Sequence, residues 1–467
     1  MLFTQIEFFL FFAVILILLI AVRSFRGQKL ILLAGSYYFY AYWDWRFLSL
    51  IFISTIVDFI AGRLLFRSEN PKTRKSLLLL SLIVNLGLLG FFKYFNFFID
   101  TAQALLAPLG FHLQSLHIIL PVGISFYTFQ TLSYTIDIYR KKIEPCSDFF
   151  DFALFVSFFP QLVAGPIVRA ADFLPQLQTP RRFTLDRSYC GGRQFIIGLF
   201  KKVFIADRLA MFVDVVFANA GAFDGVTTWL AVIAYAIQIY CDFSGYSDMA
   251  IGLARILGFD FHANFNHPYI ASSIQDFWRR WHISLSTWLR DYLYIPLGGS
   301  RRGEIRTYIN LMLTMLLGGL WHGAAWTFVF WGGFHGASLA VNRWRSEHRK
   351  SVHPAQGHPW NRLGGWLLTM AVVLIGWVFF RAPTFSQALA MLRQMFFLQS
   401  GVAWLHPFAI FCLGLMAVIH ILHACKKEKW LELPLHAWHS PAVLFLLLWL
   451  VMLYHPTDFQ PFIYFQF

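Results

Sequence analysis

The chain has 467 residues, of which 58% are hydrophobic and only 13% are charged. A soluble globular domain carries about a quarter charged residues, so this composition excludes an ordinary soluble protein. The net charge of +14 also suits a nucleic-acid binder, but the positive-inside rule and anionic lipid explain it in a membrane protein. We therefore expect the lipid bilayer as a partner, and no nucleic acid. Apolar runs continue to the last residue without a polar linker, which predicts one membrane-embedded domain over residues 1–467.

Five apolar runs in the first third of the chain predict membrane-spanning helices, since about 20 apolar residues cross the hydrocarbon core. They cover residues 6–22, 30–42, 48–65, 77–98 and 117–139. Basic clusters follow the first, third and fifth runs, at residues 23–29, 67–75 and 140–142. Because cytoplasmic loops carry the excess of Lys and Arg, this alternation places the N-terminus outside and the three clusters in the cytoplasm.

Residues 149–168 are apolar, but basic residues flank both ends. A simple crossing would place one basic flank outside, so we expect a re-entrant segment that is broken at Pro160, Gly165 and Pro166. Such irregular backbone survives at membrane depth only where it is buried in protein or lines a cavity. Further spans are expected at residues 195–217, 229–257, 309–320, 325–341, 366–380, 408–422 and 443–454. The chain is thus predicted to be an all-α polytopic membrane protein with about 10–12 transmembrane helices plus re-entrant and short helices.

Two carboxylates, Asp242 and Asp248, interrupt the apolar run 229–257. Charged side chains at membrane depth are costly and usually mark a functional site. A structural hydrogen-bond network between packed helices explains them equally well. Both interpretations stay open from the sequence.

The polar segment 276–291 is predicted to form one amphipathic helix. At about 100° per residue, one face carries Arg279, His282, Ser286 and Arg290. The opposite face carries Trp281, Leu285, Trp288 and Tyr292. An interfacial helix with tryptophan anchors explains the Trp and Arg residues, but it explains less well why a histidine lies in the polar stripe.

A helix over residues 308–321 has 14 residues and a length of about 21 Å, which is too short to cross the hydrocarbon core. Gly318, Gly319 and Gly323 then permit a break. This break places His322 near mid-depth, where irregular backbone lines a cavity. The alternative is a histidine whose ring is satisfied by a neighbouring carbonyl group.

Several familiar catalytic motifs do not occur: the sequence has no Walker A loop, no GxSxG, no HExxH and no CxxCH. The five cysteines show no CxxC pairing and no metal-ligand spacing, so no metal site is expected. No serine or cysteine stands out as an activated nucleophile. The remaining chemistry is acid–base catalysis by a histidine that acts between two bound substrates.

At these polar motifs the sequence resembles the membrane-bound O-acyltransferase family, and within it the bacterial alginate and exopolysaccharide O-acetyltransferase branch. The similar stretches are residues 121–127, 158–166, 242–252, 277–299, 316–323 and 462–467. The resemblance implies helices around a central tunnel, no bound cofactor, and a cytoplasmic acetyl donor, with acetyl-CoA as the donor substrate. It also implies the bacterial cytoplasmic (inner) membrane as location, with a periplasmic SGNH-type acetyltransferase or relay protein and a polysaccharide synthase complex as partners.

The family's key histidine corresponds to His322, between Trp321 and Gly323, and its second position to His282. His335 is a weaker candidate for that second position. The other residues expected to bind substrate or donor are Arg279, Arg280, Ser286, Arg290, Asp242, Asp248 and Trp321. Guanidinium groups bind phosphates through charge-assisted hydrogen bonds, which suits the donor. A transporter or flippase for a polysaccharide precursor or acyl group is the alternative, because broken helices and buried carboxylates also occur there.

Overall fold

The computed structural model describes the chain except for residues 181–182, 349–358, 428–431, 455–461 and 464–467. The described residues form helices and loops, with one isolated β-bridge between Phe223 and Val402. This architecture confirms the predicted all-α fold class. The chain divides into two compact units, Met1–Gly192 with Met249–His262 and Arg193–Asp248 with Ala263–Phe467. The single embedded domain expected from the sequence stays a prediction.

Several helices are long and apolar enough to cross a membrane. Among the described residues, five such stretches are Phe25–Arg67, Pro71–Leu109, Gly225–Ile256, Trp360–Arg381 and Pro407–Ala424. Two shorter apolar helices are Ile6–Ala21 and His439–Leu453. Large apolar side chains on these helices are exposed, among them Ile20, Ile83 and Phe445. Extended apolar surface of this kind indicates contact with lipid, so the chain is an integral membrane protein.

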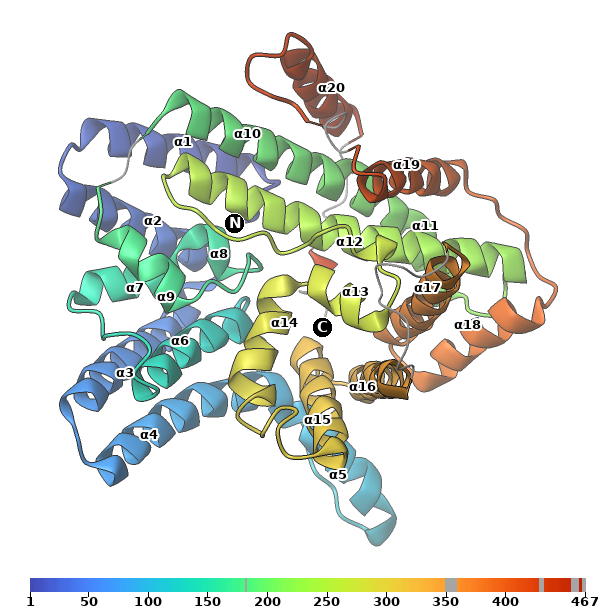
Figure 1. The fold of residues 1–467 in the computed structure, drawn as a ribbon, viewed down its shortest axis with the longest axis horizontal. Helices are drawn as coiled ribbons and strands as arrows, with labels where there is room; N and C mark the ends of the chain where they lie inside the picture. Colours follow the sequence, from blue (N-terminus) through green and yellow to red (C-terminus); the bar gives the residue numbers. More distant parts are fainter. Residues whose placement is uncertain (181–182, 349–358, 428–431, 455–461, 464–467) are drawn as a thin grey trace. The chain divides into compact units, whose positions relative to one another are not determined.

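The first unit begins with six longer helices (Figure 1). They are α1 (Ile6–Ala21), α2 (Phe25–Asp44), α3 (Leu48–Arg67), α4 (Pro71–Leu89), α5 (Phe95–Leu106) and α6 (Ile124–Tyr139). Helices α3, α4 and α6 pack against one another. Helix α6 begins at Ile124 and not at residue 117 as predicted, because Pro121 has no backbone N–H to donate and Gly123 is left-handed (φ 79°).

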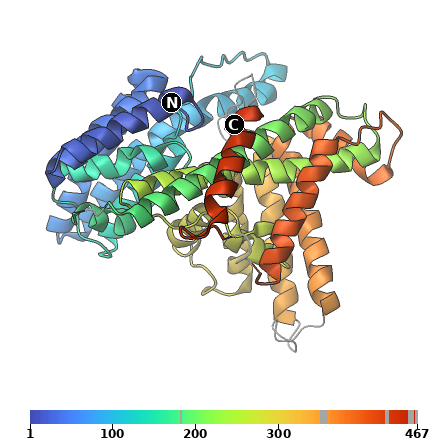
Figure 2. The ribbon, with the colours of Figure 1, turned by 90° about the horizontal axis from the view of Figure 1, so that it is seen from above.

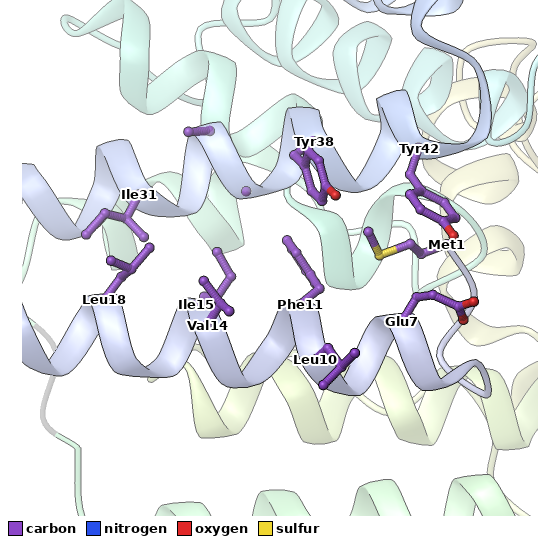
Figure 3. A pocket seen from close by; sticks show the side chains of 12 residues that line it. Met1, Glu7, Leu10, Phe11, Val14, Ile15, Leu18, Ile31, Tyr38 and Tyr42 are labelled. Carbon is purple, nitrogen blue, oxygen red and sulfur yellow. The ribbon is translucent and has the colours of Figure 1, made fainter.

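An apolar groove of about 650 Å³ lies between α1 and α2 (Figure 3). Its walls include Phe11 and Leu18 of α1 and Ile31 and Tyr38 of α2. The carboxylate of Glu7 lies at one end of this α1–α2 groove. None of the residues that line it is a predicted site residue.

The segment 149–168 is broken and buried, as predicted. Helix α7 (Phe149–Ser157) ends at Phe158, and the next helix, α8 (Phe159–Leu162), has a proline in its first turn. Every residue from 151 to 168 is buried, so this irregular backbone is enclosed by protein. Its re-entry into the membrane stays a prediction. The short helix α9 (Ala170–Phe173) follows, and α10 (Leu185–Leu199) continues into the second unit.

The second unit holds the helices that carry the predicted site (Figure 1). They are α11 (Asp207–Ala218), α12 (Gly225–Ile256), α13 (Ile274–Arg280), α14 (Ile283–Leu289), α15 (Glu304–His322), α16 (Trp326–His348), α17 (Pro359–Arg381), α18 (Phe385–Phe397), α19 (Pro407–Ala424) and α20 (His439–Leu453). The last turns of α12 belong to the first unit. Of these helices, α18 was not expected from the sequence.

Glycines bring α15 and α16 into close contact. A Cβ atom at Gly319 would collide with the backbone carbonyl of Phe328 at the start of α16. Of the three glycines predicted to permit a break, Gly318 and Gly319 lie inside a continuous α15, so that part of the prediction is wrong, whereas the break at Gly323 is confirmed. The helix continues to His322 and ends only at Gly323, whose backbone is extended (φ −156°, ψ 147°).

Candidate active site

His322 is the last residue of α15 and is 4% exposed. The extended backbone of Gly323 ends the helix directly after it. Aromatic rings surround its imidazole, with centroid distances of 5.1 Å to Trp331 and 5.4 Å to Phe380. Trp321, the neighbour in the chain, is also buried and lies 5.1 Å away. The predicted key histidine thus lies at the end of α15 and is surrounded by the rings of Trp321, Trp331 and Phe380.

His282 lies at a break between α13 and α14, in left-handed backbone (φ 43°, ψ 57°). The loop 264–266 holds this break through two backbone bonds. The amide of Ile283 donates to the Asn264 carbonyl at 2.9 Å, and the amide of Asn266 donates to the Arg280 carbonyl at 2.9 Å. The prediction of one continuous amphipathic helix over 276–291 is therefore wrong. Hydrogen bonds to the loop 264–266 replace the helical hydrogen bonds around His282, and the side chain of His282 is buried.

The break brings the two predicted histidines together. The ring centroids of His282 and His322 are 6.3 Å apart, and His282 is fully buried. The ring of Phe243, on α12, packs edge-on against the imidazole of His282, with the centroids 4.5 Å apart. His282 lies outside the candidate spans, and burial lowers the pKa of its imidazole to about 3, because removal from water penalises the charged form. The ring is neutral at physiological pH.

His335 of α16 belongs to the same aromatic cluster. It is 1% exposed, and its ring lies 4.8 Å from Trp331 and 5.2 Å from Trp278. Trp331 therefore packs against both His322 and His335. On α17, a Cβ at Gly376 would lie 2.7 Å from His335 Nε2, so the glycine leaves room for this ring.

The predicted arginine stripe does not share a face with the histidine. Arg279 and Arg290 are exposed, whereas His282 is buried. Arg290 forms an ion pair with its neighbour Asp291 at 2.7 Å. Arg280 pairs with Asp276 at 2.9 Å, and the Ser286 hydroxyl donates to the Trp281 carbonyl at 3.2 Å. The last two contacts stabilise the ends of α13 and α14, and donor binding by these residues stays a prediction.

Asp242 and Asp248 lie in ion pairs with two lysines that the sequence reading missed. Lys202 Nζ lies 2.6 Å from Asp242 and 2.6 Å from Asp207. Lys201 Nζ donates to Asp248 at 2.7 Å. This geometry favours the structural network over direct substrate contact, which stays a prediction. Two adjacent lysines inside the apolar run 195–217 were the available signal, because buried charges are expected to pair.

Phe462 and Ile463, the described residues of the C-terminal motif, contact α12 beside the histidine site. The backbone amide of Ile463 donates to Asp242 at 2.9 Å. Phe462 packs on Tyr246 at 5.0 Å and on Phe243 at 5.6 Å. Since Phe243 covers His282, the carboxylate of Asp242 holds Phe462 and Ile463 close to the histidine site.

The apolar helices and the buried histidine pair define a polytopic membrane protein with an imidazole site. Residues 38–356 match the membrane-bound O-acyltransferase family. The chain is 46% identical over 373 residues to the probable alginate O-acetylase AlgI of Azotobacter vinelandii, across 79% of this chain and 73% of that protein. It is 45% identical over 398 residues to the AlgI of Pseudomonas putida, across 85% and 80% of the two chains. The peptidoglycan O-acetyltransferase of Helicobacter pylori is 40% identical over 404 residues, across 81% and 75%.

These matches show that the chain belongs to the membrane-bound O-acyltransferase family. It is an O-acyltransferase, as the sequence motifs predicted. The chain is therefore assigned to the acyltransferases and not to the transporters or flippases. The broken helices and buried carboxylates that favoured a transporter occur here in an acyltransferase.

Proposed function

We propose that the protein transfers acetyl groups from a cytoplasmic donor, across the bacterial cytoplasmic membrane, for O-acetylation of an exopolysaccharide. Alginate or a cellulose-like polymer is the acceptor class, directly or through a periplasmic partner. The observation that carries the proposal is the buried pair His282 and His322, with ring centroids 6.3 Å apart. Relatives at 45–46% identity that are named probable alginate O-acetylases support the choice of acetyl group and polysaccharide.

The chemistry needs a base between a thioester and a weakly nucleophilic hydroxyl. His322 accepts the hydroxyl proton while the oxygen attacks the thioester carbonyl, and the C–S bond then breaks. The thiolate leaves with the proton that the imidazolium returns, so an ester and a free thiol result. Such base assistance contributes typically 10²–10⁴-fold. The surrounding rings of Trp331 and Phe380 exclude water that would hydrolyse the thioester.

His282 has a positioning role in this scheme. Its neutral imidazole lies next to His322 and is held by the backbone break, so it orients the attacking hydroxyl or the base. Acetyl-CoA is the proposed donor, and its phosphates are proposed to bind Arg279 and Arg290, which are exposed at the protein surface. A periplasmic SGNH-type acetyltransferase or relay protein and a polysaccharide synthase complex are the proposed partners.

A strain that lacks the chromosomal gene and carries a plasmid copy tests the proposal. Acetate released by alkali from the secreted polysaccharide is measured with and without the plasmid. We expect polymer acetate only with the intact chain. Full acetylation without it would overturn the proposal. Inside-out vesicles that accept label from acetyl-CoA, while sealed right-side-out vesicles do not, would support the cytoplasmic donor side.

A further inference from the structure

A second groove lies in the second unit between α16, α17 and the start of α13. It encloses about 660 Å³, and Figure 2 shows α16 and α17 side by side in orange. Mostly apolar side chains line one part of it: Phe334, Ala337 and Val341 from α16 and Leu368 and Val372 from α17, with the hydroxyls of Ser338 and Thr369 among them. Polar side chains line the other part: Asn342, Arg345 and Ser346 from α16 and Asn361 from α17. This α16–α17 groove is therefore amphipathic along its length.

The length of the groove matches one membrane leaflet. From Phe334 to Arg345 the helix advances 11 residues, which is about 16 Å. Half of the hydrocarbon core is about 15 Å thick. The apolar part, from Phe334 to Val341, is seven residues or about 10 Å long, so it holds the headgroup-proximal part of an acyl chain when the polar part lies at headgroup level.

The groove opens toward lipid. Val341, Leu368 and Trp360 line it and are 56%, 52% and 72% exposed. Trp344 and Trp366, which neighbour the lining residues Arg345 and Gly365 in the chain, are also exposed. Exposed apolar lining in a membrane protein faces hydrocarbon, and tryptophans gather at the membrane–water interface. The occupant of this groove is therefore expected to come from the bilayer.

Charge distinguishes this groove from the one between α1 and α2. Arg343 is paired with Glu347 at 2.7 Å, whereas Arg345 forms no ion pair with any residue that the structure describes. None of the lining residues of the α16–α17 groove is acidic. The α1–α2 groove instead carries the carboxylate of Glu7 together with the amino-terminal residue Met1 (Figure 3). Basic pockets between membrane helices bind anionic lipid headgroups.

We propose that the α16–α17 groove binds one anionic phospholipid. The headgroup phosphate accepts hydrogen bonds from Arg345 and from the amides of Asn342 and Asn361. One acyl chain lies along α16 and α17 between Phe334 and Val372. The site is separate from the catalytic chemistry proposed above, and it adds a lipid ligand to the acyltransferase.

Native mass spectrometry of the full-length protein tests the site. Detergent-purified protein is mixed with equal amounts of phosphatidylglycerol and phosphatidylcholine. We expect one phosphatidylglycerol to be retained in preference to phosphatidylcholine. Arg345→Gln should reduce that preference about fivefold, because a basic side chain near the headgroup contributes about 1 kcal/mol. Ala337→Trp should remove retention of both lipids, since the exposed Ala337 opens into the apolar part of the groove.

Arg67→Gln is the matched control, because Arg67 is an exposed basic residue at the end of α3, in the other unit. It should leave lipid retention unchanged. Equal loss in Arg67→Gln and Arg345→Gln would show non-specific charge attraction and overturn the proposal. Unchanged retention in Ala337→Trp would do the same. Displacement of phosphatidylglycerol by coenzyme A would assign the groove to a soluble phosphate-bearing donor and also overturn it.

Discussion

Each unit contains one buried polar cluster, and the two clusters differ in what surrounds their polar side chains. In the first unit, Asp58 of α3 is fully buried and accepts hydrogen bonds from Asn85 at 2.8 Å and from Thr135 at 2.9 Å. The Ser81 hydroxyl also donates to it. In the second unit, His282 and His322 lie among aromatic rings.

The difference leads to separate predictions for the two clusters: one joins helices, and the other is the proposed site of the chemistry. Neutral donors from α4 and α6 satisfy both carboxylate oxygens of Asp58, so the cluster connects three helices in the way that polar residues join membrane helices. Ring packing fixes the histidines and keeps bulk water away, which suits proton transfer. A substitution should therefore affect the amount of folded protein in the first cluster and the rate of transfer in the second.

The largest effect is expected for His322→Ala. Loss of the proposed base should lower polymer acetylation about 10²–10⁴-fold with normal protein in the membrane. Polymer-bound acetate and membrane protein level are measured in the same cells. Normal acetate at a normal protein level would remove His322 from the mechanism.

Asp58→Ala should change stability instead. It leaves the donors of Ser81, Asn85 and Thr135 without their acceptor, at a cost of about 1–3 kcal/mol. We expect a lower thermal midpoint in detergent and less protein in the membrane, but unchanged transfer per folded molecule. Asp58→Asn keeps one oxygen acceptor and should restore part of the stability. A lower rate per molecule with unchanged stability would break the comparison between the two clusters.

His282→Ala should have an intermediate effect on rate. The loss of one oriented hydrogen bond costs roughly 1.4 kcal/mol, which is about tenfold in rate. We expect kcat to fall at saturating donor with little change in protein level. Trp288→Ala, on the following helix, is the contrasting variant, because Trp288 is buried against Tyr292 at 5.0 Å and should mainly affect folding. An unchanged kcat in His282→Ala would leave His322 to act alone.

The sequence predicted the parts of this picture that depend on local signals. Length and hydropathy predict the apolar helices, and the Trp321-His322-Gly323 motif predicts a histidine at a helix end. The break at His282 could not be predicted, because it depends on backbone bonds from the loop 264–266. A helical periodicity argument assumes that no distant segment competes for these hydrogen bonds.

The sequence marks the two carboxylates but does not show which residues pair with them. Asp242 and Asp248 are costly at membrane depth, and their partners Lys202 and Lys201 lie 40 and 47 residues earlier in the chain. The prediction of a break at Gly318 and Gly319 is wrong, because in the structure Gly319 permits close packing of α15 on α16 and Gly318 lies against Leu289 of α14. Both cases have the same cause, since composition identifies an unusual residue but not the neighbour that explains it.

The smallest effect is expected for Arg290→Gln. Arg290 is exposed and pairs with the adjacent Asp291 at 2.7 Å, so its removal should cost little stability, as exposed ion pairs contribute about 0–1 kcal/mol. If it receives a donor phosphate, the KM for acetyl-CoA should rise up to about fivefold, with kcat unchanged. Initial rates in inside-out vesicles at several donor concentrations separate the two parameters. Asp291→Asn is the matched variant, because it removes the competing carboxylate and keeps the guanidinium. It should leave KM equal or lower. A KM that stays constant in Arg290→Gln would exclude Arg290 from the donor site and leave it as part of the exposed ion pair alone.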